Sequence, residues 1–180
     1  MIQVLSKAMN VNSIIQIQEN NGFPVRLINH HKVVSQVAEE IAKRMCEMGV
    51  EVDVKLASLM AAIHDMGKSV IVEELSSSGS LHEAAGVEVA DGLGIPRSIS
   101  KICRSHSSKT IDGLDIEEVV VRLADKLWKG KRDISFEQEV TVLCADLTGG
   151  EEWKMFMALD DIFNSITDLG HERLEQSRIK

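Results

Sequence analysis

The chain has 180 residues, of which 44% are apolar and 27% charged, so we expect one folded domain and neither a disordered nor a fibrous protein. Its 28 acidic and 20 basic side chains give a formal net charge of −8, which argues against nucleic acid or a membrane surface as a partner. Aromatic residues make up only 3% and tyrosine is absent, which disfavours a surface for stacking bases.

The cysteines and the first residues indicate the compartment. Three cysteines, Cys46, Cys103 and Cys144, lie in apolar helical patterns without metal-ligand spacing, so we expect reduced core residues. Met1 to Asn12 lack a basic start followed by an apolar block, and no run approaches the roughly 18 apolar residues of a membrane span. We therefore expect a cytoplasmic protein without a signal peptide.

Apolar periodicity and helix-end signals predict helices throughout the chain. Pro24 and Pro96 suit first helical turns, and three segments are typical of capping boxes: Ser80 to Glu83, Asp115 to Glu118 and Ser135 to Gln138. Alternation typical of strands is almost absent. The predicted helices cover residues 11–19, 24–48, 53–66, 81–93, 96–106, 116–129, 136–147 and 151–177. We predict an all-α fold, a single helical bundle. The Ser- and Gly-rich segment 69–80 is either a lid over a site or an ordinary loop.

One predicted helix ends in two polar residues. Residues 56–63 are apolar nearly all the way round, which predicts a buried helix, and His64 and Asp65 follow directly before Gly67. Burying a charged carboxylate beside an imidazole costs several kcal/mol unless it is compensated. A divalent cation bound by both side chains would compensate it, and so would a simple His–Asp hydrogen bond at a helix end.

Four further residues of metal-ligand type lie on core stripes or at helix ends. His30 is in line with the apolar stripe of its helix, whereas His31 falls on a less apolar line and is expected to support the site or to be exposed. His82 and His106 lie at the start and the end of predicted helices, and Asp125 interrupts an apolar run. The set of six favours a metal centre over isolated buried polar residues.

In chain order these residues are His30, the pair His64 and Asp65, His82, His106 and Asp125. This order resembles the H…HD…H…H…D signature of the HD-domain metal-dependent phosphohydrolase superfamily, whose fold is an α-helical bundle. The local sequences are similar too: His30-His31-Lys32-Val33-Val34-Ser35, Ile63-His64-Asp65-Met66-Gly67-Lys68 and Leu123-Ala124-Asp125-Lys126-Leu127.

The resemblance covers about residues 26–132 and implies a single HD-type domain over residues 1–180 with a metal site at its centre. The helix at 11–19 and the helices at 136–177 would pack around this core. By similarity, the first ion would bind His30, His64, Asp65 and Asp125. His82 and His106 match the two additional histidines of two-metal members, in which the aspartate of the HD pair bridges the ions.

These ligand types suit two divalent transition-metal ions, with Mn, Fe, Co and Ni as candidates and Mg as a further one. Such ions can lower the pKa of a bound water to about 7, which supplies a hydroxide that attacks a phosphate ester. Asp65 and Lys68 are the expected catalytic residues. Cations near the motif are candidate substrate-binding residues: Lys68, Lys126, Lys129 and Arg132. The alternative for these four residues is that they are solvated surface cations without a substrate role.

We therefore expect a phosphohydrolase, a phosphomonoesterase or phosphodiesterase, whose partner is a small phosphorylated substrate, most simply a nucleotide. Two alternatives stay open: a di-iron oxygenase with the same ligands, or a module that binds a nucleotide without turnover. Specificity residues are expected in the segment 21–26 and at Glu73 and Glu74. His171 fits no pattern and is expected on the surface. The apolar stripe of the last predicted helix is expected to serve core packing or a homodimer contact.

Overall fold

The computed structural model describes residues 9–177, so the expectation about a signal peptide in Met1 to Asn12 falls largely outside the described residues. Residues 9–177 contain no strand, which confirms the all-α prediction, and none of their helices is long and apolar enough to cross a membrane. The helices in chain order are α2 (Val11–Asn20), α3 (Val25–Glu47), α4 (Val54–Ala61), the 3-10 helices η1 (Met66–Ser69) and η2 (Val72–Leu75), α5 (Leu81–Gly92), α6 (Arg97–Ser100), α7 (Ile102–Ser105), α8 (Ile116–Leu127), α9 (Ile134–Thr148), α10 (Glu152–Asp168) and α11 (Gly170–Ser177).

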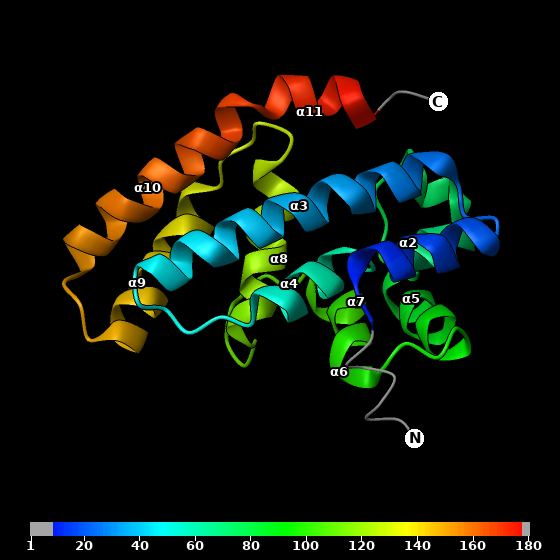
Figure 1. The fold of residues 1–180 in the computed structure, drawn as a ribbon, viewed down its shortest axis with the longest axis horizontal. Coiled ribbons are helices and arrows are strands. Elements are labelled where there is room, and N and C mark those ends of the chain that lie inside the picture. The colour runs from blue at the N-terminus through cyan, green and yellow to red at the C-terminus, as the bar shows by residue number, and fades with distance from the viewer. Residues whose placement is uncertain (1–8, 178–180) are drawn as a thin grey trace.

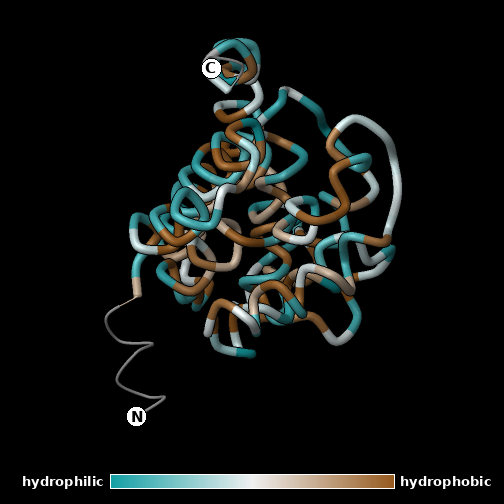
Figure 2. Tube along the Cα trace, turned by 90° about the vertical axis from the view of Figure 1, so that its right-hand side faces the viewer, coloured by the Kyte–Doolittle hydropathy of each residue, from teal (hydrophilic) through white to brown (hydrophobic). Residues whose placement is uncertain are grey.

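The long helix α3 forms the axis of the bundle. It crosses the middle of Figure 1 and contacts α2, α4, α8, α10 and α11. Its buried side chains include Val34, Val37 and Ile41, which repeat at helical spacing and face the other helices. Figure 2 shows the apolar segments gathering where helices face one another and the polar segments turned outward. Burial of these apolar side chains is the main force that holds the helices together.

Three predicted helices are interrupted in the structure. The prediction for 53–66 is too long, because α4 ends at Ala61 and a buried turn continues the apolar run. The segment 96–106 forms two short helices, α6 and α7, and the segment 151–177 forms α10 and α11. Apolar periodicity survives a turn inside a core, so it does not mark these breaks.

Helix starts follow the predicted caps only in part. The backbone N–H of Asp115 donates to Glu118 Oε2 at 3.0 Å, as expected for a capping box. Ser80 makes no capping hydrogen bond, and α9 is capped by Asp133, whose side chain accepts from the N–H of Phe136, and not by Ser135. The two prolines directly precede their helices.

The junction between α10 and α11 depends on a close approach of two glycines. A Cβ atom added to Gly170 would lie 2.5 Å from the Cα atom of Gly130, a distance that folded proteins do not tolerate between backbones. Gly170 therefore lets the chain pass close to the segment that follows α8. Beyond it, α11 continues in nearly the direction of α10 and reaches the side of the molecule where α3 begins (Figure 1).

Two further predictions are met in part. Cys103 and Cys144 are buried, but Cys46 is exposed and is not a core residue. On α10, the stripe that includes Leu159, Ile162, Phe163 and Ile166 is buried, as expected for core packing. Trp153, Phe156 and Met157 are exposed on the same helix, and the homodimer contact stays a prediction.

Candidate metal centre

The turn after α4 presents His64 and Asp65 inside the bundle. Three successive backbone carbonyl groups at the end of α4 accept hydrogen bonds from side chains. Ala61 O accepts from His64 Nδ1 at 2.8 Å, Ala62 O from Gln18 Nε2 at 2.7 Å and Ile63 O from Cys103 Sγ at 3.3 Å. Buried carbonyls at a helix end need such partners. The helix can therefore stop in the interior, immediately before the two candidate ligands.

Gly67 brings the next candidate ligand close. A Cβ atom at position 67 would lie 2.0 Å from the carbonyl oxygen of His82 and 2.6 Å from the backbone nitrogen of Gly86. Only glycine therefore allows η1 to pack directly on the first turns of α5. This contact places the side chain of His82 against Asp65.

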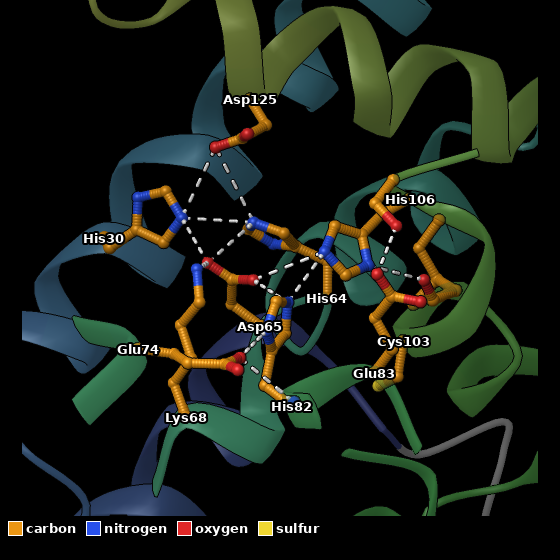
Figure 3. A network of polar contacts seen from close by, with 12 residues as sticks. His30, His64, Asp65, Lys68, Glu74, His82, Glu83, Cys103, His106 and Asp125 are labelled. Atoms are coloured by element: carbon orange, nitrogen blue, oxygen red, sulfur yellow. Dashed lines mark hydrogen bonds and ion pairs between the residues drawn. The ribbon is translucent and has the colours of Figure 1, made fainter. Parts of the chain in front are cut away.

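Four side chains form the first cluster, which lies between α3, the turn after α4 and α8 (Figure 3). His30 Nε2 lies 3.1 Å from His64 Nε2, 3.4 Å from Asp65 Oδ2 and 3.4 Å from Asp125 Oδ1. His64 Nε2 lies 3.8 Å from Asp65 Oδ2 and 3.7 Å from Asp125 Oδ1. His30, His64 and Asp65 thus lie close enough together to hold one ion, and Asp125 adjoins the two imidazole nitrogens.

The other oxygen of Asp65 faces a second cluster. Asp65 Oδ1 lies 3.2 Å from His82 Nε2 and 3.4 Å from His106 Nε2, and these two nitrogens lie 3.2 Å apart. The carboxylate of Asp65 therefore stands between the two clusters, with one oxygen in each (Figure 3).

The hydrogen bonds on the far side of the rings fix where the protons are. Nδ1 of His64 and of His106 faces a backbone carbonyl oxygen, and Nδ1 of His82 lies 2.5 Å from Glu74 Oε2. Because these oxygens only accept, each Nδ1 is the donor, and each ring in its neutral form presents a bare Nε2 lone pair. In that form the lone pairs of His82 and His106 face one another at 3.2 Å. Facing lone pairs repel unless a cation lies between them.

The spacings fit divalent ions. Two ligand atoms that each lie about 2.1 Å from an ion, at angles of 90° to 110°, are about 3.0 to 3.4 Å apart. The contacts of His30 within the first cluster are 3.1 to 3.4 Å, and those within the second are 3.2 to 3.4 Å. Mixed imidazole and carboxylate ligands suit Mn, Fe, Co, Ni and Zn.

The protonation of the first cluster also suits a cation. Burial acts to raise the pKa of Asp65, but the charge of His64 and hydrogen bonds from neighbouring histidines hold that pKa well below its usual range. Burial likewise opposes the hydrogen bond from His64 that lowers the pKa of Asp125. The pKa of His30 is lowered, mainly by burial, whereas the two carboxylates raise the pKa of His64 against the effect of burial. Two charged carboxylates thus attract a positive charge to this point.

Two residues outside the predicted set orient the ligands. The buried carboxylate of Glu74 accepts from Nδ1 and the backbone N–H of His82 and from the backbone N–H of Leu81. The indole N–H of Trp128 donates to Asp125 Oδ1 at 3.3 Å, and its ring centroid lies 5.3 Å from that of His30. Outer partners of this kind fix the tautomer and direction of ligand rings. Glu74 was expected to contribute to specificity, and its hydrogen bonds are with His82 and the backbone of Leu81.

The two remaining histidines are not among the six candidate ligands. His31 was expected to support the site or to be exposed; it is completely buried and Nδ1 lies 2.9 Å from Gln18 Oε1. His171 is exposed on α11, as predicted.

A cavity of about 1010 Å³ opens beside the first cluster. It lies between the start of α3, the end of α8 and α11, and its lining includes the candidate ligands His30, Asp65 and Asp125. Its other lining residues are Pro24, Val25, Arg26, Leu27, Asn29, Lys68, Leu75, Trp128, Lys129, Leu174 and Ser177. Three cations thus face the cavity, and its carboxylates are candidate metal ligands.

The structure separates the four predicted substrate-binding cations into two pairs. Lys68 and Lys129 line the cavity, where Lys68 Nζ lies 2.6 Å from Asp65 Oδ2 and Lys129 Nζ lies 3.6 Å from Asp125 Oδ2. Lys126 and Arg132 do not line it. Lys126 pairs with Asp133, and Arg132 pairs with Glu137 and Asp160, which directs both side chains toward α9 and α10. Arg26 adds a cation to the wall, from within the segment 21–26 that was expected to contribute to specificity.

Comparisons with known proteins agree with the order of the six residues. A profile of the HD domain family matches residues 27–128, more than half of the chain. An uncharacterized protein of Methanocaldococcus jannaschii is 26% identical over 129 residues, which cover 63% of this chain and 73% of that relative. No solved structure gives a significant match. The profile match confirms the resemblance seen in the sequence, and the chain belongs to the HD domain family.

Proposed function

We propose that this protein is a metal-dependent phosphohydrolase that cleaves a phosphate ester of a small molecule, with nucleotides as the substrate class. The observation that carries the proposal is the pair of ligand clusters that share Asp65 beside a cavity lined by cations. Members of the HD domain family are generally metal-dependent phosphohydrolases.

We propose six residues as metal ligands. His30, His64, Asp65 and Asp125 would hold one ion, and Asp65, His82 and His106 a second. When bound, such ions supply positive charge for phosphate oxygens and a water of lowered pKa. Asp65 is the shared ligand because each of its oxygens faces one cluster.

The cations of the cavity would hold the substrate. Lys68 projects beside Asp65, so its ammonium group can donate to a phosphate oxygen next to the first cluster. Lys129 also lines the cavity, and its ammonium group lies 3.6 Å from Asp125. Because both carboxylates would share their charge with an ion, the two ammonium groups become available to a phosphate. These residues position the anion and need not form a covalent bond with it.

The rest of the cavity suits a compact organic group. Leu75, Trp128 and Leu174 offer apolar surface at a short distance from the cations. Small-molecule sites of about 300 to 1,000 Å³ with apolar walls and a few polar groups are common in proteins. A nucleotide, with its phosphate at the first cluster and its base toward α11, fits this division.

The test begins with metal content. Wild type, His64→Ala and the exposed control His171→Ala are purified without chelator, and we expect about two ions per chain in wild type and control and a large loss in His64→Ala. Phosphate release from a panel of nucleotides follows. A wild type that binds no Mn or Fe would refute the proposal. Iron with oxygen consumption in place of phosphate release would indicate an oxygenase, and nucleotide binding without turnover would indicate a binding module.

A further inference from the structure

One side-chain amide joins three elements behind the first cluster. Gln18 lies on α2 and is completely buried, as are His31 on α3 and Ala62 in the turn after α4. Gln18 Nε2 donates to Ala62 O at 2.7 Å, and Gln18 Oε1 lies 2.9 Å from His31 Nδ1. The residues at the two ends of the first bond are 44 positions apart in the chain.

The direction of these hydrogen bonds is determined by chemistry. A carbonyl oxygen only accepts, so the amide nitrogen of Gln18 must face Ala62 and its oxygen must face His31. Nδ1 of His31 is therefore the donor, and its buried Nε2 is bare and has no hydrogen-bond partner within residues 9–177. A hydrocarbon side chain at position 31 would leave the buried Gln18 oxygen unpaired, which is costly.

The amide links the two elements that present the first three candidate ligands. His31 directly follows His30, and Ala62 precedes His64 by two residues. The ring of His31 also packs edge-on against that of His64, with centroids 5.5 Å apart and an interplanar angle of 67°. The separation of His30 Nε2 from His64 Nε2, 3.1 Å, thus depends on how α3 and the turn are joined. A displacement of about 1 Å is enough to spoil such a site.

We propose that Gln18 and His31 are positioning residues that set the geometry of the first metal site. The proposal rests on the proposed function only in requiring that the clusters bind metal. It assigns a role to α2, which lies outside residues 27–128 that match the HD domain family. The hydrogen bonds of this amide are with Ala62 and His31 and not with the second cluster, so the affinity of the second cluster for its ion should change less.

The experiment titrates Mn²⁺ into metal-stripped full-length protein by calorimetry. Gln18→Met removes the amide but keeps an unbranched side chain, and His31→Leu removes the donor. His31→Asn keeps a donor close to the position of Nδ1. Thr141→Val is the matched control, because Thr141 is buried and donates to Glu137 O within α9, remote from the clusters.

We expect Gln18→Met and His31→Leu to lower the affinity for one of the two ions by about 10- to 100-fold, the usual effect of losing a residue that supports a metal ligand. His31→Asn should restore most of the affinity, and Thr141→Val should bind as wild type does. Circular dichroism checks that each variant is folded. A role only in folding would lower the melting temperature and leave the affinity of the folded protein unchanged.

Several results would overturn the proposal. Folded Gln18→Met with wild-type affinity would do so while leaving the metal centre intact. His31→Asn binding as weakly as His31→Leu would show that the donor is not what matters. If Gln18→Met does not fold, the two His31 variants decide. A wild type that binds no Mn²⁺ would refute the metal centre together with this proposal.

Discussion

Glu74 provides a sharp test of the second cluster. Its buried carboxylate receives three N–H donors, from the backbone of Leu81 and His82 at 3.1 Å each and from His82 Nδ1 at 2.5 Å. The hydrogen bond from His82 holds the pKa of Glu74 below its ordinary value, so the carboxylate is charged near neutral pH. Glu74→Ala removes all three contacts and frees the imidazole of His82 to rotate away from Asp65.

The expected loss of metal affinity follows from those contacts. Loss of an outer partner typically weakens metal binding by about 10- to 100-fold, and Glu74→Ala should show the full effect at one of two ions. Glu74→Gln should lie in between, because one amide oxygen can still accept from His82 Nδ1 while the amide nitrogen opposes the N–H of Leu81. The affinity of the first cluster for its ion should change less, because Glu74 contacts His82 and is linked to the first cluster through His82 and Asp65.

Calorimetric titration of metal-stripped protein with Mn²⁺ measures both ions, and Glu73→Ala is the matched control because Glu73 is exposed in the same turn. The reasoning is refuted if Glu74→Ala binds both ions as wild type does. It is equally refuted if both ions weaken to the same extent, because Glu74 would then act through the fold and not through His82.

Three other perturbations follow from the structure. Gly67→Ala places a Cβ atom 2.0 Å from the backbone of α5, which cannot move aside as a flexible side chain could. Chemical denaturation should therefore show a free energy of unfolding about 1 to 3 kcal/mol lower than that of wild type. Burial acts to raise the pKa of Glu118, but its hydrogen bonds, first that from Lys101 at 2.9 Å, outweigh burial and lower the pKa below its usual value. A lowered folded-state pKa means stability that is present above about pH 4.5 and is lost as pH falls through the folded value. Denaturation across pH 3 to 7 should therefore show a steeper acid loss in wild type than in Glu118→Gln, and equal slopes would contradict this. Lys68→Ala should lower kcat/KM for the cleaved phosphate ester by at least about tenfold with metal content unchanged, whereas Lys126→Ala, outside the cavity, should leave kcat/KM near wild type.

Local sequence signals sufficed for most helix positions and for the order of the candidate ligands. Apolar spacing of Val34, Val37 and Ile41 predicts the buried face of α3 because that face repeats with the helix turn. His64 and Asp65 stand out because polar residues at the end of an apolar helix need a partner. Such signals lie within a few residues of one another, so a single sequence contains them.

The cations show where local reasoning stops. Lys126, Lys129 and Arg132 are neighbours in sequence, yet only Lys129 lines the cavity. α8 ends at Leu127, so neither Lys129 nor Arg132 continues the helix face on which Lys126 lies. The ion pairs with Asp133, Glu137 and Asp160 then draw the other two cations away.

The sequence alone determined the all-α class, most helix positions, the family and the six candidate metal ligands, because periodicity, caps and motif order are local or linear properties. Only the tertiary structure decided that Asp65 offers one oxygen to each cluster, and that Glu74 and Gln18 support the ligands. Gln18 meets Ala62 across 44 positions through a single hydrogen bond. No periodic pattern marks such a contact, because it exists only once the packing of α2, α3 and α4 has brought distant polar groups into the same dry interior.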